Sequence, residues 1–178
     1  IINAQKNLLI EKPMTLSTED AEDLVFLAEK NKLIENNNEA IKYYQKCIEI
    51  NPNESAAFFQ LANLLTYVNP DDSEAYCLRA IEISPNNKWY HYFLIQLYRH
   101  QFNLEKEVLV WEVLIDQNPL KSEYYFDAAL IYTDLGLYKK ALRTLDKHEK
   151  EIGFSEQVFL FQSEIMKKEG NKKKQLQF

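Results

Sequence analysis

The side chains that could catalyse a reaction or hold a metal are few: three histidines and two cysteines. His91 and His100 lie nine residues apart on one predicted helix. About 900° of rotation separates them, so they point to opposite faces and cannot share a metal ion from that helix. His148 stands among acidic residues, as is typical of a solvated helix face. Cys47 and Cys77 lack the spacing of a metal or redox motif, and a free cysteine on an apolar helix face acts as a small hydrophobe.

The sequence also lacks a recognisable nucleophile or phosphate-binding loop. No serine or cysteine has a histidine at a catalytic spacing. The three glycines, Gly136, Gly153 and Gly170, are each 17 residues apart, which is the spacing of turns in a repeat and not of a phosphate loop. We therefore predict that this stretch is not an enzyme and binds neither a metal nor a cofactor.

The composition indicates a folded, helical protein. Of its 178 residues, 46% are hydrophobic and 27% are charged, as in globular proteins and unlike disordered chains. Three glycines and five prolines are too few for the turns of a many-stranded sheet. The net charge of −6 disfavours nucleic acid as a partner, because binding to phosphates needs clustered positive charge. No apolar run approaches the ~20 residues of a membrane span.

Three dipeptides reveal a repeat: Asn51-Pro52, Ser84-Pro85 and Asn118-Pro119, spaced 33 and then 34 residues apart. Each follows an amphipathic stretch, and a fixed period of this length predicts a stacked helical solenoid. Each period holds two helices. The first are expected near 20–34, 54–67, 88–101, 121–134 and 155–169, and the second near 38–50, 71–83, 104–117 and 138–151, with a last one begun at about 172.

On this period the chain resembles the tetratricopeptide repeat (TPR) family. The fourth unit matches best, with small, aromatic and glycine residues at the family's positions: Ala128, Ala129, Tyr132, Gly136, Tyr138 and Ala141. Small residues let the paired helices approach, aromatic residues fill the gap beside them, and the proline ends the second helix. Gly136 and Gly170 suit a left-handed residue at a helix end. Some positions depart from the family pattern: Asn31 replaces an aromatic residue, Glu107 a small one and Gly153 a proline.

The resemblance implies an all-α, right-handed superhelix of four full repeats and a partial fifth. Residues 1–19 would form an N-terminal extension and residues 20–178 the TPR array, with units at about 21–54, 55–87, 88–121, 122–155 and 156–178. Two segments are similar to bacterial, envelope-associated TPR proteins: the start of unit three, Asn87-Lys88-Trp89-Tyr90, and the end of unit four, from Asp146 to Glu151-Ile152-Gly153. Both a cytoplasmic and a periplasmic location stay open. Ile1 is not a methionine, and the chain stops inside a predicted second helix, so we expect it to belong to a longer protein.

The family also implies a function, the binding of a peptide or protein partner in a concave groove lined by the first helices. One position of successive units forms an apolar-to-aromatic ladder: Val25, Phe59, Tyr92, Phe126 and Leu160. The alternative is that these rings pack between adjacent first helices and only stabilise the array. The predicted groove residues are Phe59, Gln60, Asn63, Tyr67, Trp89, Tyr92, Phe93, Gln96, Arg99, Phe126, Asp127 and Leu130, continued by Leu160, Phe161 and Glu164 in the partial fifth unit.

Some TPR domains hold acidic C-termini with a clamp of cations. The matching positions in this chain are Val25, Glu29, Gln60, Trp89 and Phe93. None of them is one of the clamp's cations, so binding of acidic C-termini is not expected. Two other interpretations stay open. The array could self-associate to a homo-oligomer through its terminal repeat or through residues 1–12, or regulate a larger enzyme. The apolar residues near the N-terminus could fill the groove or belong to a plain linker: Ile1, Ile2, Leu8, Leu9 and Ile10.

Overall fold

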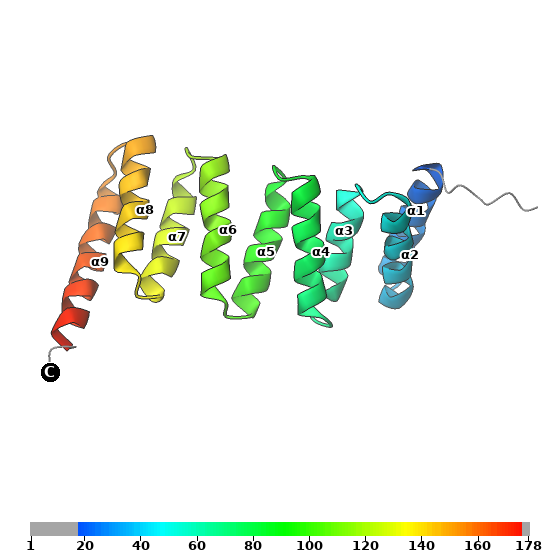
Figure 1. Ribbon diagram of the computed structural model, residues 1–178, viewed down its shortest axis with the longest axis horizontal. Coiled ribbons are helices and arrows are strands. Elements are labelled where there is room, and N and C mark those ends of the chain that lie inside the picture. The colour runs from blue at the N-terminus through cyan, green and yellow to red at the C-terminus, as the bar shows by residue number, and fades with distance from the viewer. Residues whose placement is uncertain (1–17, 176–178) are drawn as a thin grey trace, which may run out of the picture.

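The computed structural model describes residues 18–175 and the side chains of residues 21–170. This part of the chain forms nine α-helices and no strand, arranged side by side in one row (Figure 1). Most contacts join helices that follow each other in the sequence. The helices are α1 (Thr18–Leu33), α2 (Asn37–Ile50), α3 (Ser55–Leu65), α4 (Pro70–Ile83), α5 (Lys88–His100), α6 (Leu104–Gln117), α7 (Ser122–Asp134), α8 (Tyr138–Glu151) and α9 (Glu156–Gln175).

Asparagine side chains mark where three of the helices begin. The side-chain oxygens of Asn69, Asn87 and Asn103 accept hydrogen bonds from backbone N–H groups in the first turns of α4, α5 and α6. These N–H groups have no partner within the helix, so the caps satisfy donors that would otherwise be lost. Pro70 is the first residue of α4, where its missing N–H costs nothing. The predicted starts of these helices are therefore correct to within a residue.

Left-handed residues occur in several turns. Gly153, between units four and five, has φ 110°, and Gly136, in the turn between the paired helices α7 and α8, has φ 71°. The matching turns after α1 and α5 place Glu35 at φ 58° and Phe102 at φ 53°, a conformation that is costly for a residue with a Cβ atom. Phe102 gains no packing in return, because 90% of its surface is exposed.

The C-terminal end differs from the sequence-based prediction. Helix α9 continues without interruption from Glu156 to Gln175. Gly170 lies inside this helix, so the predicted left-handed turn at Gly170 and the separate helix beginning at about 172 are both wrong. A helical glycine costs only about 1 kcal/mol relative to alanine, which the surrounding helix formers offset. The described residues begin at Thr18, where α1 starts. Most of the predicted N-terminal extension (residues 1–19), with its apolar residues and possible fold-back, therefore lies outside them.

The core is a line of small and aromatic residues between the paired helices. Ala28, Ala62 and Ala129 are fully buried, and Tyr44 and Tyr132 fill the space beside them, as the repeat predicts. Cys47 and Cys77 are also fully buried and free, and the Cys77 Sγ atom lies 3.3 Å from the Tyr90 carbonyl oxygen. Burial raises the pKa of the Cys77 thiol to about 12, so both cysteines are packing residues.

His148 corrects another expectation. It was predicted on a solvated face of α8, but only 1% of its surface is exposed. Its Nε2 atom lies 2.7 Å from the Ser122 hydroxyl oxygen, and Tyr125 and Phe126 pack edge-on against its ring. Its acidic neighbours in the sequence lie on other sides of the helix. Desolvation lowers the pKa of His148, so the ring is held in its neutral form.

Candidate functional site

Aromatic side chains connect each first helix to the next. We call the surface of α3, α5, α7 and α9 the first-helix face. Phe59 of α3 stacks on Tyr90 of α5 at 4.7 Å between ring centroids and meets Phe93 edge-on at 5.3 Å. Phe126 of α7 stacks on Phe161 of α9 at 6.2 Å. Tyr90 is buried and the four phenylalanine rings are half-buried, so these four pack between neighbouring first helices and still present part of their surface to solvent.

Tyr92 lies at the centre of this face. Its hydroxyl oxygen lies 2.8 Å from that of Tyr124 on α7, and its ring packs against Trp111 and edge-on against Trp89. A pocket of about 330 Å³ opens between α5 and α7, lined by Tyr92, Trp111, Tyr124, Lys88, Lys121, Glu123 and Asp127. The pocket thus combines three aromatic rings with two cations and two carboxylates.

A buried carboxylate orients Arg99 on the same face. The Arg99 Nε atom donates to the Glu107 Oε1 atom at 2.6 Å, and the Trp111 indole N–H donates to the same oxygen at 3.4 Å. Glu107 is 1% exposed, which explains why this acidic residue occupies a position that is small in the family. Burial raises the pKa of Asp127, and the Arg99 charge acts in the opposite direction.

All twelve predicted groove residues lie on α3, α5, α7 or the turn that follows α3, but they differ in exposure. Six are half-buried: Phe59, Gln60, Tyr92, Phe93, Phe126 and Asp127. Six are exposed: Asn63, Tyr67, Trp89, Gln96, Arg99 and Leu130. Tyr67 is separate from the central group, because it lies beyond the end of α3 and packs edge-on against His100. Trp89 is the largest ring in this set that stays open to solvent, at 64% exposure.

Six residues of this site were not predicted from the sequence. Five of them line the central pocket, namely Lys88, Trp111, Lys121, Glu123 and Tyr124, and the sixth, Glu107, fixes Arg99. A sequence signal existed for the lysines: Lys88 begins α5 and Lys121 directly precedes α7, so they occupy adjacent positions of the repeat in units three and four. The contribution of Tyr124 depends on its contact with Tyr92 in the previous unit, which only the stacking of the units creates.

The repeat is also found by comparison with known families. Two family models described as tetratricopeptide repeat match residues 31–54 and 43–69. Residues 31–69 of the chain thus carry tetratricopeptide repeat sequence. None of the curated proteins matches its sequence significantly.

Solved TPR structures share this arrangement of helices at low sequence identity. The MamA protein covers 85% of this chain and 89% of its own length, with a TM-score of 0.58 and 16% identity. YrrB, described as a TPR protein with an unusual peptide-binding site, covers 76% and 70%, with a TM-score of 0.55 and 15% identity. A TPR protein from Parabacteroides merdae covers 86% and 61%, with a TM-score of 0.61 and 18% identity. At these identities the likeness shows the fold alone.

TPR arrays expose long surfaces that serve protein–protein interaction in general. No helix in the described part of this TPR protein is long and apolar enough to cross a membrane. Its described residues also contain no group of three or more His, Cys, Asp or Glu side chains placed to hold a metal ion.

Proposed function

We propose that this TPR protein is an interaction scaffold that binds a peptide or partner segment along its first-helix face, centred on the pocket between α5 and α7. The observation that carries the proposal is the exposure of Trp89 beside the half-buried Tyr92 and Phe93. Large rings at the centre of a surface are typical of residues that dominate binding energy. YrrB, a TPR protein of similar fold, is described as having a peptide-binding site.

The surroundings of Trp89 indicate what the partner segment needs. Lys88 lies with its Nζ atom 5.3 Å from the Trp89 ring centroid, and Lys121 lines the same pocket. An apolar side chain of the partner would rest on the rings, and an acidic group next to it would meet the two lysines. Asn63 and Gln96 are exposed and hydrogen-bond through their side chains to no other described residue, so they are free to bind a partner backbone.

The test is a pull-down from lysate of the source cells, with wild type beside Trp89→Ala/Gln96→Ala. These two side chains are exposed, so the variant should keep its fold, whereas substitutions of Tyr92 or Phe126 would also remove packing. Phe102→Ala is the control, since it removes another exposed ring, which lies in the turn after α5. A partner retained by the control and lost by the double variant supports the site.

The captured segment is then made as a synthetic peptide and titrated into the protein. Trp89 should move from a solvated to an apolar setting, which shifts its fluorescence to shorter wavelength. The shift should be absent when Trp89 is replaced and present when Trp111 is replaced by phenylalanine. Equal capture of the partner by wild type and the Trp89→Ala/Gln96→Ala variant would place the binding site elsewhere on the array.

A further inference from the structure

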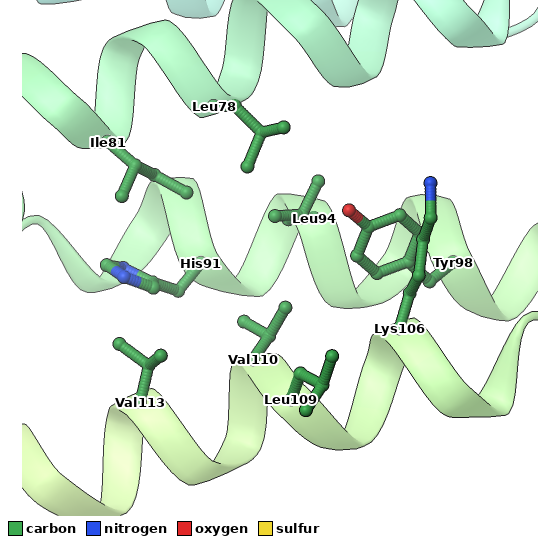
Figure 2. Close-up of a pocket in the computed structure, with 9 residues that line it drawn as sticks. All are labelled: Leu78, Ile81, His91, Leu94, Tyr98, Lys106, Leu109, Val110 and Val113. Carbon is green, nitrogen blue, oxygen red and sulfur yellow. The ribbon is translucent and has the colours of Figure 1, made fainter.

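A second pocket lies on the opposite side of the array, between the second helices α4 and α6. Figure 2 shows the aliphatic side chains of α4 and α6 pointing toward one another across α5, which lies between the two helices in this view. The pocket has a volume of about 280 Å³ and is lined by Leu78, Ile81, His91, Leu94, Tyr98, Lys106, Leu109, Val110 and Val113. Three of these aliphatic residues are substantially exposed: Leu78 at 41%, Leu109 at 56% and Val113 at 45%. We call this pocket the α4–α6 cleft.

The same positions are polar or small in the neighbouring units, so the α4–α6 cleft is not a general property of the repeat. Along the 33- and 34-residue periods, Leu78 corresponds to Gln45 and Glu112. Val113 corresponds to Arg79 and Lys147. Leu109 corresponds to Ala75 in one neighbour and to Arg143 in the other. All three positions therefore carry large apolar side chains between α4 and α6, but not between α2 and α4 or between α6 and α8.

In the neighbouring units, longer side chains occupy the equivalent space. Between α2 and α4, Tyr76 packs on Phe58 at 6.2 Å and the Arg79 guanidinium lies 5.9 Å from the same ring. Between α6 and α8, Lys147 forms an ion pair with Asp116 at 2.6 Å, and the Tyr132 hydroxyl donates to Glu112. The α4–α6 cleft keeps contacts of this kind at one end, where the Tyr98 hydroxyl and the Lys106 ammonium both bind Glu74. At its remaining positions it has short aliphatic groups. An apolar surface kept open in this way is typical of a binding site.

His91 gives the cleft a polar group without a partner. Its ring is 2% exposed, and its Nδ1 atom lies 3.2 Å from the Asn87 carbonyl oxygen. Because a carbonyl only accepts, Nδ1 carries the proton and Nε2 is left as an acceptor. Nε2 is buried and has no hydrogen-bond partner among the described residues. A buried acceptor without a donor is costly, so an occupant that donates a hydrogen bond would be favoured.

The charge and length of the cleft restrict the occupant further. Helices α4 and α6 each carry four acidic residues and one basic residue, and Lys106, the cation in the lining, pairs with Glu74. Glu82, one turn after Leu78, and Glu105, one turn before Leu109, are exposed and lie on the same helix faces as those leucines, so each wall carries an exposed acidic side chain. From His91 to Tyr98 the floor extends over two helical turns, or about 10 Å, which matches apolar side chains at positions i, i+3 or i+4, and i+7 of a bound helix. The volume of the cleft, about 280 Å³, is just below the range of about 300–1,000 Å³ that is typical of small-molecule sites. Its size therefore favours a few side chains of a docked segment over a small-molecule ligand.

From these features we infer that the α4–α6 cleft is a second docking site, which binds a basic amphipathic helix of a partner protein. The apolar stripe of that helix rests on Leu78, Leu109 and Val113. One tyrosine or tryptophan of the stripe donates its O–H or N–H to His91 Nε2, since these side chains join an apolar ring to a donor. Lysines or arginines beside the stripe face the acidic walls. This site is independent of the one proposed on the first-helix face.

The test is a selection from a displayed library of 20-residue helical peptides, in which the stripe positions vary among apolar residues, tyrosine and tryptophan and the flanking positions are fully randomised. Peptides are selected on the wild-type chain and counter-selected on Leu109→Arg/Val113→Lys. This variant places the residues of unit four, Arg143 and Lys147, at the equivalent positions of unit three, so its fold should persist. If circular dichroism shows that it does not fold, Leu78→Gln, which copies Gln45, takes its place.

The selected peptides should be basic and carry a tyrosine or tryptophan in the stripe. As synthetic peptides they should bind the Leu109→Arg/Val113→Lys variant about 30-fold more weakly than wild type or worse, and bind less tightly as salt increases. His91→Phe, which copies Phe58, should weaken binding about 3- to 10-fold. Trp89→Ala should leave binding unchanged.

Several results would overturn the inference. It is wrong if no peptide distinguishes wild type from the cleft variant, or if the selected peptides are acidic. It is also wrong if Trp89→Ala, and not the cleft variant, abolishes binding, because the peptides would then occupy the first-helix face. Equal binding to wild type and His91→Phe would refute the donated hydrogen bond.

Discussion

Removing Arg99 should destabilise the protein more than removing Glu107, although Glu107 is the more buried partner. The Arg99 side chain is 45% exposed and that of Glu107 is 2% exposed. Arg99→Ala leaves the buried carboxylate with only the long hydrogen bond from Trp111. Breaking a fully buried ion pair costs about 3–5 kcal/mol. Because water already reaches Arg99 and can partly replace it, we expect a loss of about 2 kcal/mol in the free energy of unfolding for Arg99→Ala.

Glu107→Ala removes the buried charge itself. The half-exposed guanidinium is then free to turn into water, and the variant regains a small residue that the family has at this position. We expect this change to cost about 1 kcal/mol. The double variant should resemble Glu107→Ala, which gives a coupling energy of about 1–2 kcal/mol between the two side chains.

The assay is urea unfolding followed by circular dichroism, because Trp111 contacts Glu107 and its fluorescence would report the substitution as well as the unfolding. Arg99→Lys serves as the control: it keeps the charge, loses the planar donor group and should fall between wild type and Arg99→Ala. A larger cost for Glu107→Ala than for Arg99→Ala would refute the reasoning. So would a double variant whose loss equals the sum of the two single losses.

Three further predictions concern the fold. Phe102→Gly should raise the free energy of unfolding by about 1 kcal/mol, since glycine relieves the left-handed strain and the exposed ring contributes no packing. Thermal melting measures the change, and the control Phe102→Ala should alter the melting temperature little. Lowering the pH from 7.5 to 5.5 should destabilise the protein, because burial lowers the pKa of His148 below its usual 6.5. As the pH falls, the unfolded chain therefore binds a proton at His148 before the folded chain does. The urea midpoint of His148→Gln should depend less on pH than that of the wild type. Ala129→Phe should overpack unit four at a cost of about 1–3 kcal/mol, and an unchanged melting temperature would contradict the repeat phase.

The positions of the helices were predictable because local signals and the period agree. Asparagine caps, the prolines and the 33- to 34-residue spacing each indicate the same boundaries, and α4 and α6 begin and end within one residue of the prediction. Gly170 shows the limit of such signals: it has the spacing of a turn glycine but lies inside α9. A glycine permits a turn without requiring one, so the residues around it determine whether the helix ends there.

The candidate sites were predictable only in part. The phase of the repeat was enough to place Trp89, Tyr92 and Phe93 on the first-helix face. It did not predict that Tyr92 shares a hydrogen bond with Tyr124 or that His148 is buried, because both depend on how side chains of different helices pack. The α4–α6 cleft required the comparison of three units after their packing was known, since Leu78, Leu109 and Val113 lie on two different helices.

The location of the cysteines and tryptophans gives this protein built-in reporters of where it opens. Cys47 and Cys77 are the only thiols in the sequence and both are fully buried, so a thiol reagent can react only when units one or two unfold locally. Trp89 and Trp111 both belong to unit three. In a repeat array, neighbouring units can open separately. In mild denaturant, the rate of thiol labelling reports the unfolding of units one and two, and tryptophan fluorescence reports the unfolding of unit three. Recorded together, they show whether the N-terminal units unfold first or the whole array unfolds cooperatively.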